Sequence, residues 1–252
     1  MNHGDNLHLT AGPIASAVIG FTLQVERFYA GLISVAEWGA QAGLGGKLLY
    51  AGQLDGEARA LLVAANIAGA ASLVATADVT AAKRAMRDGV VDFLVTSLDE
   101  ALRILKNELR QRQAVAVCAA LPAEAVAEEM RERGVLPDIE PPLQPAPVEE
   151  SQALLAWRVA SAPALSLPKL DALALDCLPP EATSERRWLQ LAPRYLGRLA
   201  QGERLLRCNR KFAVEFLLQA RRLVESGEIP VPVEITFSGG GELNEHRLTP
   251  PG

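Results

Sequence analysis

Short apolar runs alternate with longer amphipathic stretches through the first half of the chain. The apolar runs predict strands at Lys47–Ala51, Ser72–Thr76, Val90–Val95 and Ala114–Ala119. The stretches between and after them predict helices that end at about Ala70, Asp88, Arg112 and Arg133. Strands that are apolar throughout and alternate with helices are typical of a buried parallel sheet with helices on both faces. We therefore predict an α/β, Rossmann-like fold for residues 46–140.

Polar residues mark the starts of several predicted helices. Asp78 and Ser97 stand where a side-chain oxygen can accept a hydrogen bond from an unpaired backbone N–H. Glu100 follows Ser97 at the spacing of a capping box. A fifth short strand is predicted at Pro137–Ile139.

A long amphipathic helix is predicted before the first strand, from Pro13 to about Gln41, with a frayed tail ahead of it. A break is expected at Gly31. The helix either belongs to the core or forms a dimer interface; the core role is favoured, and a homodimer is the expected assembly. Apolar residues recur along it at helical spacing: Ala17, Phe21, Val25, Phe28, Leu32 and Val35.

A proline-rich segment, Pro141–Glu150, separates this half from the rest and predicts a linker or a surface crossover. Beyond it, Gln152–Val159 predicts a strand, while Ala172–Cys177 fits either a strand or a helix. Helices are predicted at Ser184–Leu199 and Arg210–Ser226.

Near the end of the chain, Pro230–Phe237 alternates like a strand and carries two prolines, which only an edge strand tolerates. The residues from Ser238 onward are expected to form a mobile tail. We thus predict a tail and helix (1–45), a Rossmann-like domain (46–140) and an α+β portion (151–240). That last portion either extends the parallel sheet or forms a small subdomain.

The net charge of −5 and the aromatic content of 5% argue against a nucleic-acid-binding surface. Gln24, Glu26 and Arg27 interrupt the apolar stretch Ile14–Ile33 and argue against a membrane span. Met1–Thr10 is polar and lacks the basic start of a secretory signal. We expect a cytoplasmic protein with neither nucleic acid nor membrane as a partner.

The cysteines, Cys118, Cys177 and Cys208, form no CxxC pair, which fits a reducing compartment and three small core residues. Arg207 and Arg210 flank Cys208 and would lower the pKa of its thiol if the thiol were exposed.

Other candidate groups favour structural roles. Asp171 and Asp176 could act as paired carboxylates, but the apolar run around them indicates that they flank a buried element. Several arginines on one predicted helix could bind an anion, although a solvated face is favoured: Arg186, Arg187, Arg194 and Arg198. The histidines lie near the chain ends, at His3, His8 and His246, so neither a histidine-based catalytic site nor a metal site is predicted.

The turn Gly52–Gly56 follows the first predicted strand and opens the next helix, which is where nucleotide phosphates bind in a βαβ unit. The glycine-rich segment Gly43–Gly46 precedes that strand and is interpreted as a connector.

The sequence from Gly46 to about Asp138 resembles the central Rossmann-like domain of the urocanase (urocanate hydratase) family. The resemblance is carried by GKLLYAG, AANIAG, KRAMRDG, VVDFLVTSLDEALRILKNELR and AVAVCA. It implies a domain that binds NAD tightly and uses it as an electrophile toward the imidazole of urocanate.

The chain departs from the family pattern at the places where NAD would be held. The family has a glycine-dense loop where this chain has Gln53–Arg59, which keeps Gly56 and Leu54. Asp55 and Glu57 would lie against the pyrophosphate, whereas at the start of a helix they favourably complement its dipole.

Two further departures follow. Thr76 replaces the acidic residue that would contact the ribose; Asp78 could take over that contact, although a helix cap is favoured. The segments that flank the domain in the family are unmatched, and only Asp138 is in a comparable place.

The residues predicted to line a ligand site are Gly52, Gln53, Asp55, Gly56, Thr76 and Asp78. No catalytic residue and no metal ligand is identified. We expect a protein without hydratase chemistry that binds a small molecule, a nucleotide or a partner. No cofactor is expected, and NAD is the one that the resemblance allows. The alternative is an NAD-dependent, urocanase-like hydratase or lyase linked to histidine degradation.

Overall fold

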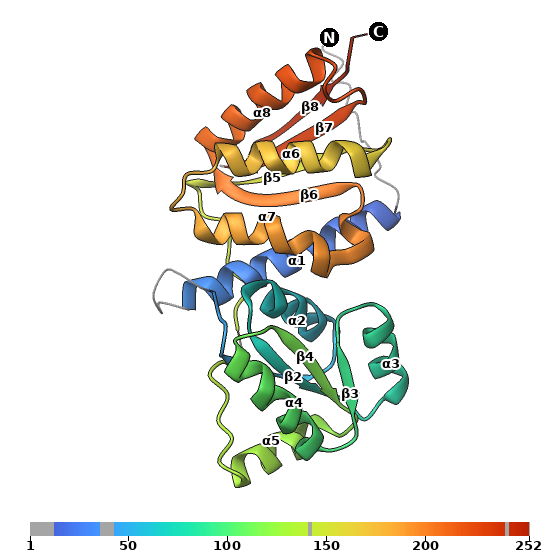
Figure 1. The fold of residues 1–252 in the computed structure, drawn as a ribbon, viewed down its shortest axis with the longest axis vertical. Coiled ribbons are helices and arrows are strands. Elements are labelled where there is room, and N and C mark those ends of the chain that lie inside the picture. The colour runs from blue at the N-terminus through green and yellow to red at the C-terminus, as the bar shows by residue number, and fades with distance from the viewer. Residues whose placement is uncertain (1–12, 36–42, 141–142, 240–241, 252) are drawn as a thin grey trace, which may run out of the picture.

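The computed structural model describes residues 13–35, 43–140, 143–239 and 242–251. Two four-stranded sheets lie at opposite ends of an elongated molecule, with helices between them (Figure 1). The sheets belong to consecutive parts of the chain, so each is built from its own stretch of sequence.

The first sheet is parallel and has the strand order β1-β2-β4-β3. Its strands are β1 (Leu48–Gln53), β2 (Ala71–Ala75), β3 (Phe93–Val95) and β4 (Val115–Ala119). The helices are α2 (Gly56–Ala68), α3 (Val79–Arg87), α4 (Leu98–Gln111) and α5 (Ala123–Glu132). The α/β, Rossmann-like fold predicted from the sequence is confirmed.

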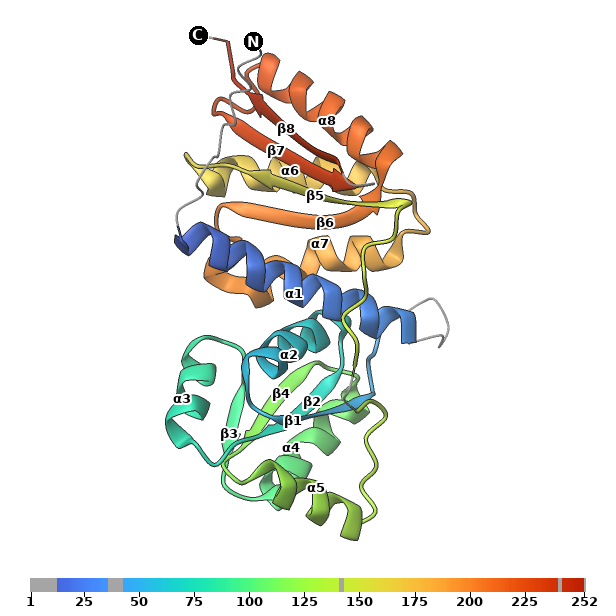
Figure 2. The ribbon, with the colours of Figure 1, turned by 180° about the vertical axis from the view of Figure 1, so that it is seen from behind.

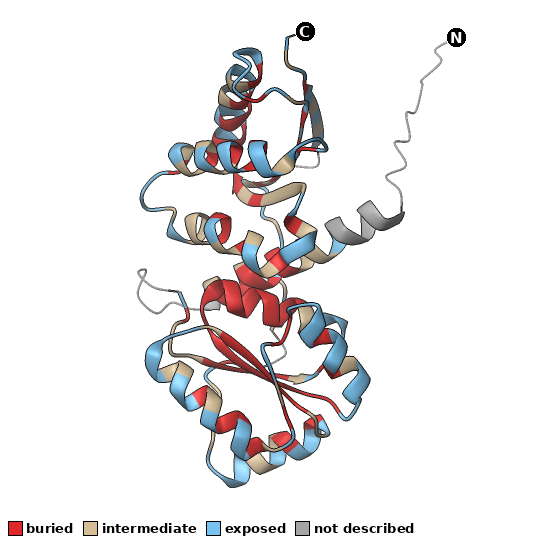
Figure 3. Cartoon of the chain, turned by 45° about the vertical axis from the view of Figure 1, so that its right-hand side comes forward, coloured by how far each residue is buried: buried red, intermediate tan, exposed pale blue. Residues whose placement is uncertain are grey.

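Alternate strand residues enter two apolar cores, one on each face of this sheet. Val74 packs in the core that contains α2 and α3, while Leu73 and Val117 pack with α4 and α5. The central strands β2 and β4 are buried throughout and α2 is buried along most of its length, whereas the edge strand β3 exposes Phe93 (Figure 3). The predicted fifth strand is reduced to one bridge, in which Ile139 pairs with Leu49.

Helix α1 (Pro13–Val35) crosses the molecule between the two sheets (Figure 2). Val25, Phe28 and Leu32 are buried there, as the predicted apolar stripe requires. The expected break at Gly31 is wrong, because the helix continues past it. A Cβ at Gly31 would lie 2.8 Å from the Gln144 carbonyl oxygen, so the glycine allows the following segment to pass close by. The predicted extension to Gln41 falls outside the described residues.

The second sheet is antiparallel and has the order β6-β5-β7-β8. Its strands are β5 (Gln152–Arg158), β6 (Glu203–Asn209), β7 (Val233–Gly239) and β8 (Glu242–Leu248). Helices α6 (Pro163–Cys177), α7 (Thr183–Leu196) and α8 (Arg210–Glu225) accompany it, and a short 3-10 helix, Gly197–Ala200, follows α7. This part of the chain therefore forms a sheet of its own beside the parallel one.

Two sequence predictions for this half need correction, and one that left two alternatives open is settled. The strand predicted at Pro230–Phe237 is not an edge strand, since β7 pairs with both β5 and β8. Its prolines precede the pairing and so remove no ladder hydrogen bond. The supposed tail after Ser238 forms β8, and the ambiguous segment Ala172–Cys177 is the last part of α6.

Side chains from both halves meet at the junction between the sheets. Arg187 of α7 donates from Nε to the Ile67 carbonyl oxygen at 2.7 Å, near the C-terminus of α2 where a cation is favourable. The rings of Tyr29 and Trp188 lie 5.2 Å apart, centroid to centroid. One continuous apolar core thus includes residues of both sheets. Within the described part of the chain, no helix combines the length and hydropathy of a membrane span. The homodimer and the cytoplasmic location remain predictions.

Candidate functional site

The topology of the parallel sheet points to the carboxyl ends of β2 and β4 as the place where a ligand would bind. These strands are neighbours, yet the chain leaves β2 toward α3 on one face and leaves β4 toward α5 on the other. Ligands of open α/β sheets bind where the connections diverge in this way. Thr76 and Ala120, which directly follow the two strands, are therefore at the expected ligand edge.

The turn after β1 is tied to the end of β2. Leu54 N–H donates to the Ala75 carbonyl oxygen at 2.8 Å, and Gln53 Nε2 donates to Thr76 Oγ1 at 3.2 Å. Gly52 has a φ of +71°, a left-handed value that favours glycine. The predicted residues Gln53 and Thr76 are thus brought together, but their polar atoms contact each other.

The carboxylate of Asp55 is the N-cap of α2. Its Oδ1 accepts a hydrogen bond from Ala58 N–H at 2.8 Å, and Glu57 adds a second acidic side chain in the first helical turn. The start of α2 therefore already carries an anion and has lost one of its free donors. The sequence prediction that these acids complement the helix dipole is confirmed by this contact.

Asp78 is likewise the N-cap of a helix, in this case α3. Its Oδ1 accepts from Thr80 N–H at 2.8 Å and from Ala81 N–H at 3.1 Å, which caps α3. Thr76, which is buried, also accepts a hydrogen bond from Asp78 N–H at 3.1 Å. The capping interpretation of Asp78 is confirmed.

These residues do not fit the pyrophosphate of NAD. A Cβ at Gly52 or Gly56 would meet nothing within 4 Å, so space is not the obstacle. The obstacle is charge, because the carboxylates of Asp55 and Glu57 stand where a doubly charged group would lie. Their position at the helix start turns an anion-binding element into an acidic one.

Asp138, the residue in a comparable place in the resemblance, holds the start of β1. It accepts hydrogen bonds from Leu48 N–H and from Lys47 Nζ, each at 2.9 Å. Burial raises the pKa of the Asp138 carboxyl, but these two contacts outweigh it, so the pKa lies below its usual value.

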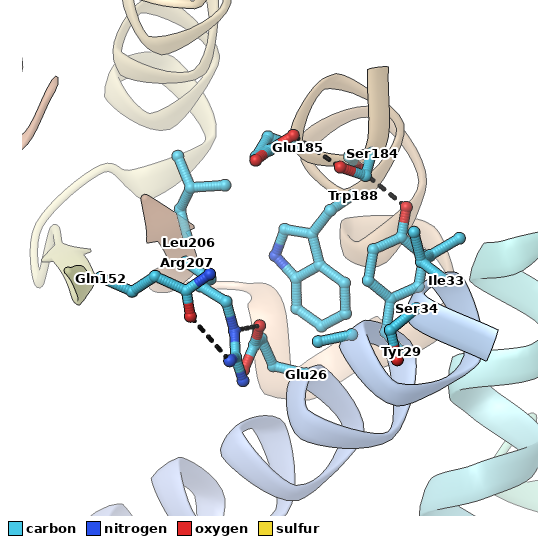
Figure 4. Close-up of a pocket in the computed structure, with 11 residues that line it drawn as sticks. Glu26, Tyr29, Ile33, Ser34, Gln152, Ser184, Glu185, Trp188, Leu206 and Arg207 are labelled. Atoms are coloured by element: carbon cyan, nitrogen blue, oxygen red, sulfur yellow. Dashed lines mark hydrogen bonds and ion pairs between the residues drawn. The ribbon is translucent and has the colours of Figure 1, made fainter. Parts of the chain in front are cut away.

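The structure also contains a cavity of about 190 Å³ at the junction of the two sheets, lined by none of the residues of the predicted site (Figure 4). Residues of α1, α7 and β6 supply most of its lining. They are Glu26, Tyr29, Ala30, Ile33, Ser34, Gln152, Ser184, Glu185, Trp188, Leu206 and Arg207.

A buried ion pair lies at one side of this cavity. Arg207 donates from Nε to Glu26 Oε1 at 2.7 Å and from Nη2 to Oε2 at 2.9 Å. The Glu26 side chain is 3% exposed and that of Arg207 13%. Sequence reasoning missed this pair because its members are separated by most of the chain; an acid within the apolar stripe of a helix was the signal that could have indicated it.

The remaining sequence candidates have structural partners. Asp171 pairs with Arg204 at 3.0 Å and accepts from Trp157 Nε1 at 3.3 Å, so it is not half of a carboxylate pair with the exposed Asp176. Arg186 donates to the Leu178 and Pro179 carbonyl oxygens. In the residues that the structure places, no group of three metal-ligating side chains occurs.

Cys208 is buried rather than exposed, despite its arginine neighbours. Burial raises the pKa of its thiol to about 12 and that of the Cys118 thiol to about 11. Neither thiol is therefore a thiolate near neutral pH.

The first half of the chain matches a known protein family. Residues 25–142 match the model of the Urocanase Rossmann-like domain. This segment is a urocanase Rossmann-like domain. The match begins inside α1 and ends after α5, so the antiparallel sheet lies outside it.

An S-methyl thiourocanate hydratase from Variovorax sp. is 29% identical to this chain over 115 residues. The alignment covers 46% of this chain and 21% of the hydratase. The chain therefore spans about a fifth of that relative.

Proposed function

We propose that this protein binds a small molecule or a partner through a urocanase-type Rossmann domain, and that it neither holds NAD nor hydrates urocanate. The observation that supports this most is the Asp55 carboxylate, which accepts the Ala58 N–H at the start of α2. A pyrophosphate in that place would have to displace the carboxylate and then lie beside it and Glu57.

Electrostatics makes that displacement costly. Two like charges about 4 Å apart repel by roughly 1 kcal/mol in water and by several times more near a protein surface. Close approach of a pyrophosphate also needs bare backbone amides, which glycines provide. In this turn Gln53 and Thr76 hydrogen-bond each other instead.

A ligand at the carboxyl ends of β2 and β4 would therefore be uncharged or cationic rather than a dinucleotide. Asp78 and the Thr76 hydroxyl are polar groups at this edge, although each already makes contacts within the chain. Recognition here suits a ligand that is smaller than NAD and lacks phosphate groups.

The cofactor content of the purified protein tests the proposal. The full chain is denatured, and the supernatant is analysed for NAD by mass spectrometry. We expect far less than one equivalent, and stoichiometric NAD would contradict the proposal. A thermal-shift titration with NAD then tests for weaker binding, because a ligand of the native state raises the melting temperature.

The second candidate is an NAD-dependent, urocanase-like hydratase or lyase. Its support is the identity to the S-methyl thiourocanate hydratase, which is confined to a fifth of that protein. An assay that follows the ultraviolet absorbance of urocanate, with NAD added, separates the candidates. Turnover that depends on NAD would replace our proposal with this one.

A further inference from the structure

The cavity at the junction of the sheets is lined by none of the residues predicted at the ligand edge of the parallel sheet, and its walls have a distinct chemistry. It is formed jointly by the urocanase-type domain, through α1, and by the C-terminal half, through α7 and β6. Its volume of about 190 Å³ suits a single ring with a short substituent, since a cavity of about 150 Å³ holds benzene in another protein.

One wall of the cavity is aromatic. Tyr29 and Trp188 pack against each other at a ring angle of 48°, and Ile33 and Leu206 add apolar surface. Burial raises the pKa of the Tyr29 phenol well above its usual value, and its hydroxyl donates to the Ser184 carbonyl oxygen at 2.8 Å. Tyr29 is therefore a neutral, fixed wall with an electron-rich ring face.

Among the described residues that line the cavity, Arg207 is the single cation, and all of its donors are in use. Arg207 has five N–H donors. Two donate to Glu26, and the other three donate to the Gln152 side-chain oxygen and to the carbonyl oxygens of Ala146 and Pro147. An anionic ligand would find no donor left on this guanidinium.

Glu185 is the charged side chain of the lining that still has an oxygen available to accept a hydrogen bond from a ligand. Among the hydrogen bonds of the described residues, its Oε2 accepts from the Ser184 hydroxyl at 2.6 Å, and its other oxygen accepts none. Glu185 and Trp188 are three residues apart on α7 and so share one face of the helix (Figure 4). With two carboxylates and one guanidinium, the lining carries net negative charge.

We propose that this cavity binds a small organic cation of single-ring size, with Glu185 as its counter-ion and the rings of Tyr29 and Trp188 as its aromatic wall. A carboxylate beside electron-rich ring faces is the arrangement that recognises ammonium groups. The carboxyl ends of β2 and β4 play no part in this site.

Three probes of similar size but different charge test the proposal on the full chain: benzylammonium, benzyl alcohol and benzoate. The indole N–H signal of Trp188, assigned with a Trp188→Phe variant, reports binding in an NMR titration. We expect saturable shifts with benzylammonium, weaker ones with benzyl alcohol and none with benzoate. Equal binding of benzoate and benzylammonium, or binding of none of the three, would overturn the proposal.

Two variants locate the site. Glu185→Gln keeps the side-chain shape and should weaken benzylammonium binding at least five-fold, with little change for benzyl alcohol. Ala30→Leu should fill the cavity and abolish both. Glu181→Gln, an exposed acid just before α7, is the matched control and should change neither. If benzylammonium binds all of these proteins as it binds the wild type, it binds elsewhere and the proposal fails.

Discussion

The two sheets of this protein differ in two respects. The parallel sheet lies within a match to a known family whereas the antiparallel sheet does not, and the polar side chains beside the two sheets have different partners. The parallel sheet belongs to a urocanase Rossmann-like domain, yet the polar residues at its ligand edge cap helices and contact one another. The antiparallel sheet and α7, outside that match, contribute to a cavity whose lining keeps an acceptor available. The comparison teaches that a fold and its ligand site are separable, because side chains at a few positions decide what binds.

This comparison assumes that the two sheets form one cooperative unit rather than independent domains. The largest expected effect therefore tests whether both sheets unfold in a single transition. Trp157 of β5 and Leu73 of β2 are both fully buried, one in each sheet. Trp157→Ala should cost about 3–5 kcal/mol of unfolding free energy and Leu73→Ala about 2–5 kcal/mol. Each should shift a single urea transition measured by far-UV circular dichroism.

The single transition is expected because one apolar core spans α1, α2, α7 and both sheets. Two resolved transitions, of which each variant moves only one, would show that the sheets unfold independently.

The next effect concerns the ion pair that joins α1 to the antiparallel sheet. Arg207→Met leaves the buried Glu26 carboxylate without its partner and should cost about 3 kcal/mol of unfolding free energy in urea denaturation. The double variant Glu26→Leu/Arg207→Met removes both charges and should recover most of the loss. A double variant as unstable as the single one would mean that Arg207 acts through packing instead.

A smaller effect tests the capping role at the parallel sheet. Asp55→Ala removes the acceptor for Ala58 N–H and should lower the unfolding free energy by about 1 kcal/mol. Asp55→Asn keeps a cap oxygen and serves as the control, with a smaller loss expected. Equal loss in both variants would assign the effect to charge rather than to the hydrogen bond.

The smallest effect concerns the rates at which the three cysteine thiols react. With a thiol-specific disulfide reagent, the part-exposed Cys177 should react first in the native protein. The thiols of Cys118 and Cys208, with pKa values of about 11 and about 12, should react only when urea unfolds the chain. A fast reaction of native Cys208, lost in Cys208→Ser, would contradict its burial.

Sequence patterns predicted the parallel sheet well because its central strands, β2 and β4, are buried on both faces and thus almost entirely apolar. β2 and β4 were predicted within one or two residues of their ends. The caps at Asp78 and Ser97 were also predictable, since capping depends on residues only a few positions apart.

The antiparallel sheet was harder because its strands carry charged residues. β6 reads ERLLRCN, and its arginines gain partners only in the folded chain: Arg204 with Asp171, and Arg207 with Glu26. The sequence of β8, ELNEHRL, is mostly polar and so suggests a tail, but its backbone pairs with β7 in the folded chain. The cavity could not be predicted either, because its lining comes from segments that are distant in sequence.

We propose that an acidic cap has taken the place of an anion site at the start of α2. Isothermal titration calorimetry of the full chain with NAD tests it most directly, with the Asp55→Gly/Glu57→Ser variant measured in parallel. We expect no saturable heat for the wild type up to millimolar NAD, and measurable binding only in the variant. Stoichiometric binding of NAD to the wild type with micromolar affinity would contradict it.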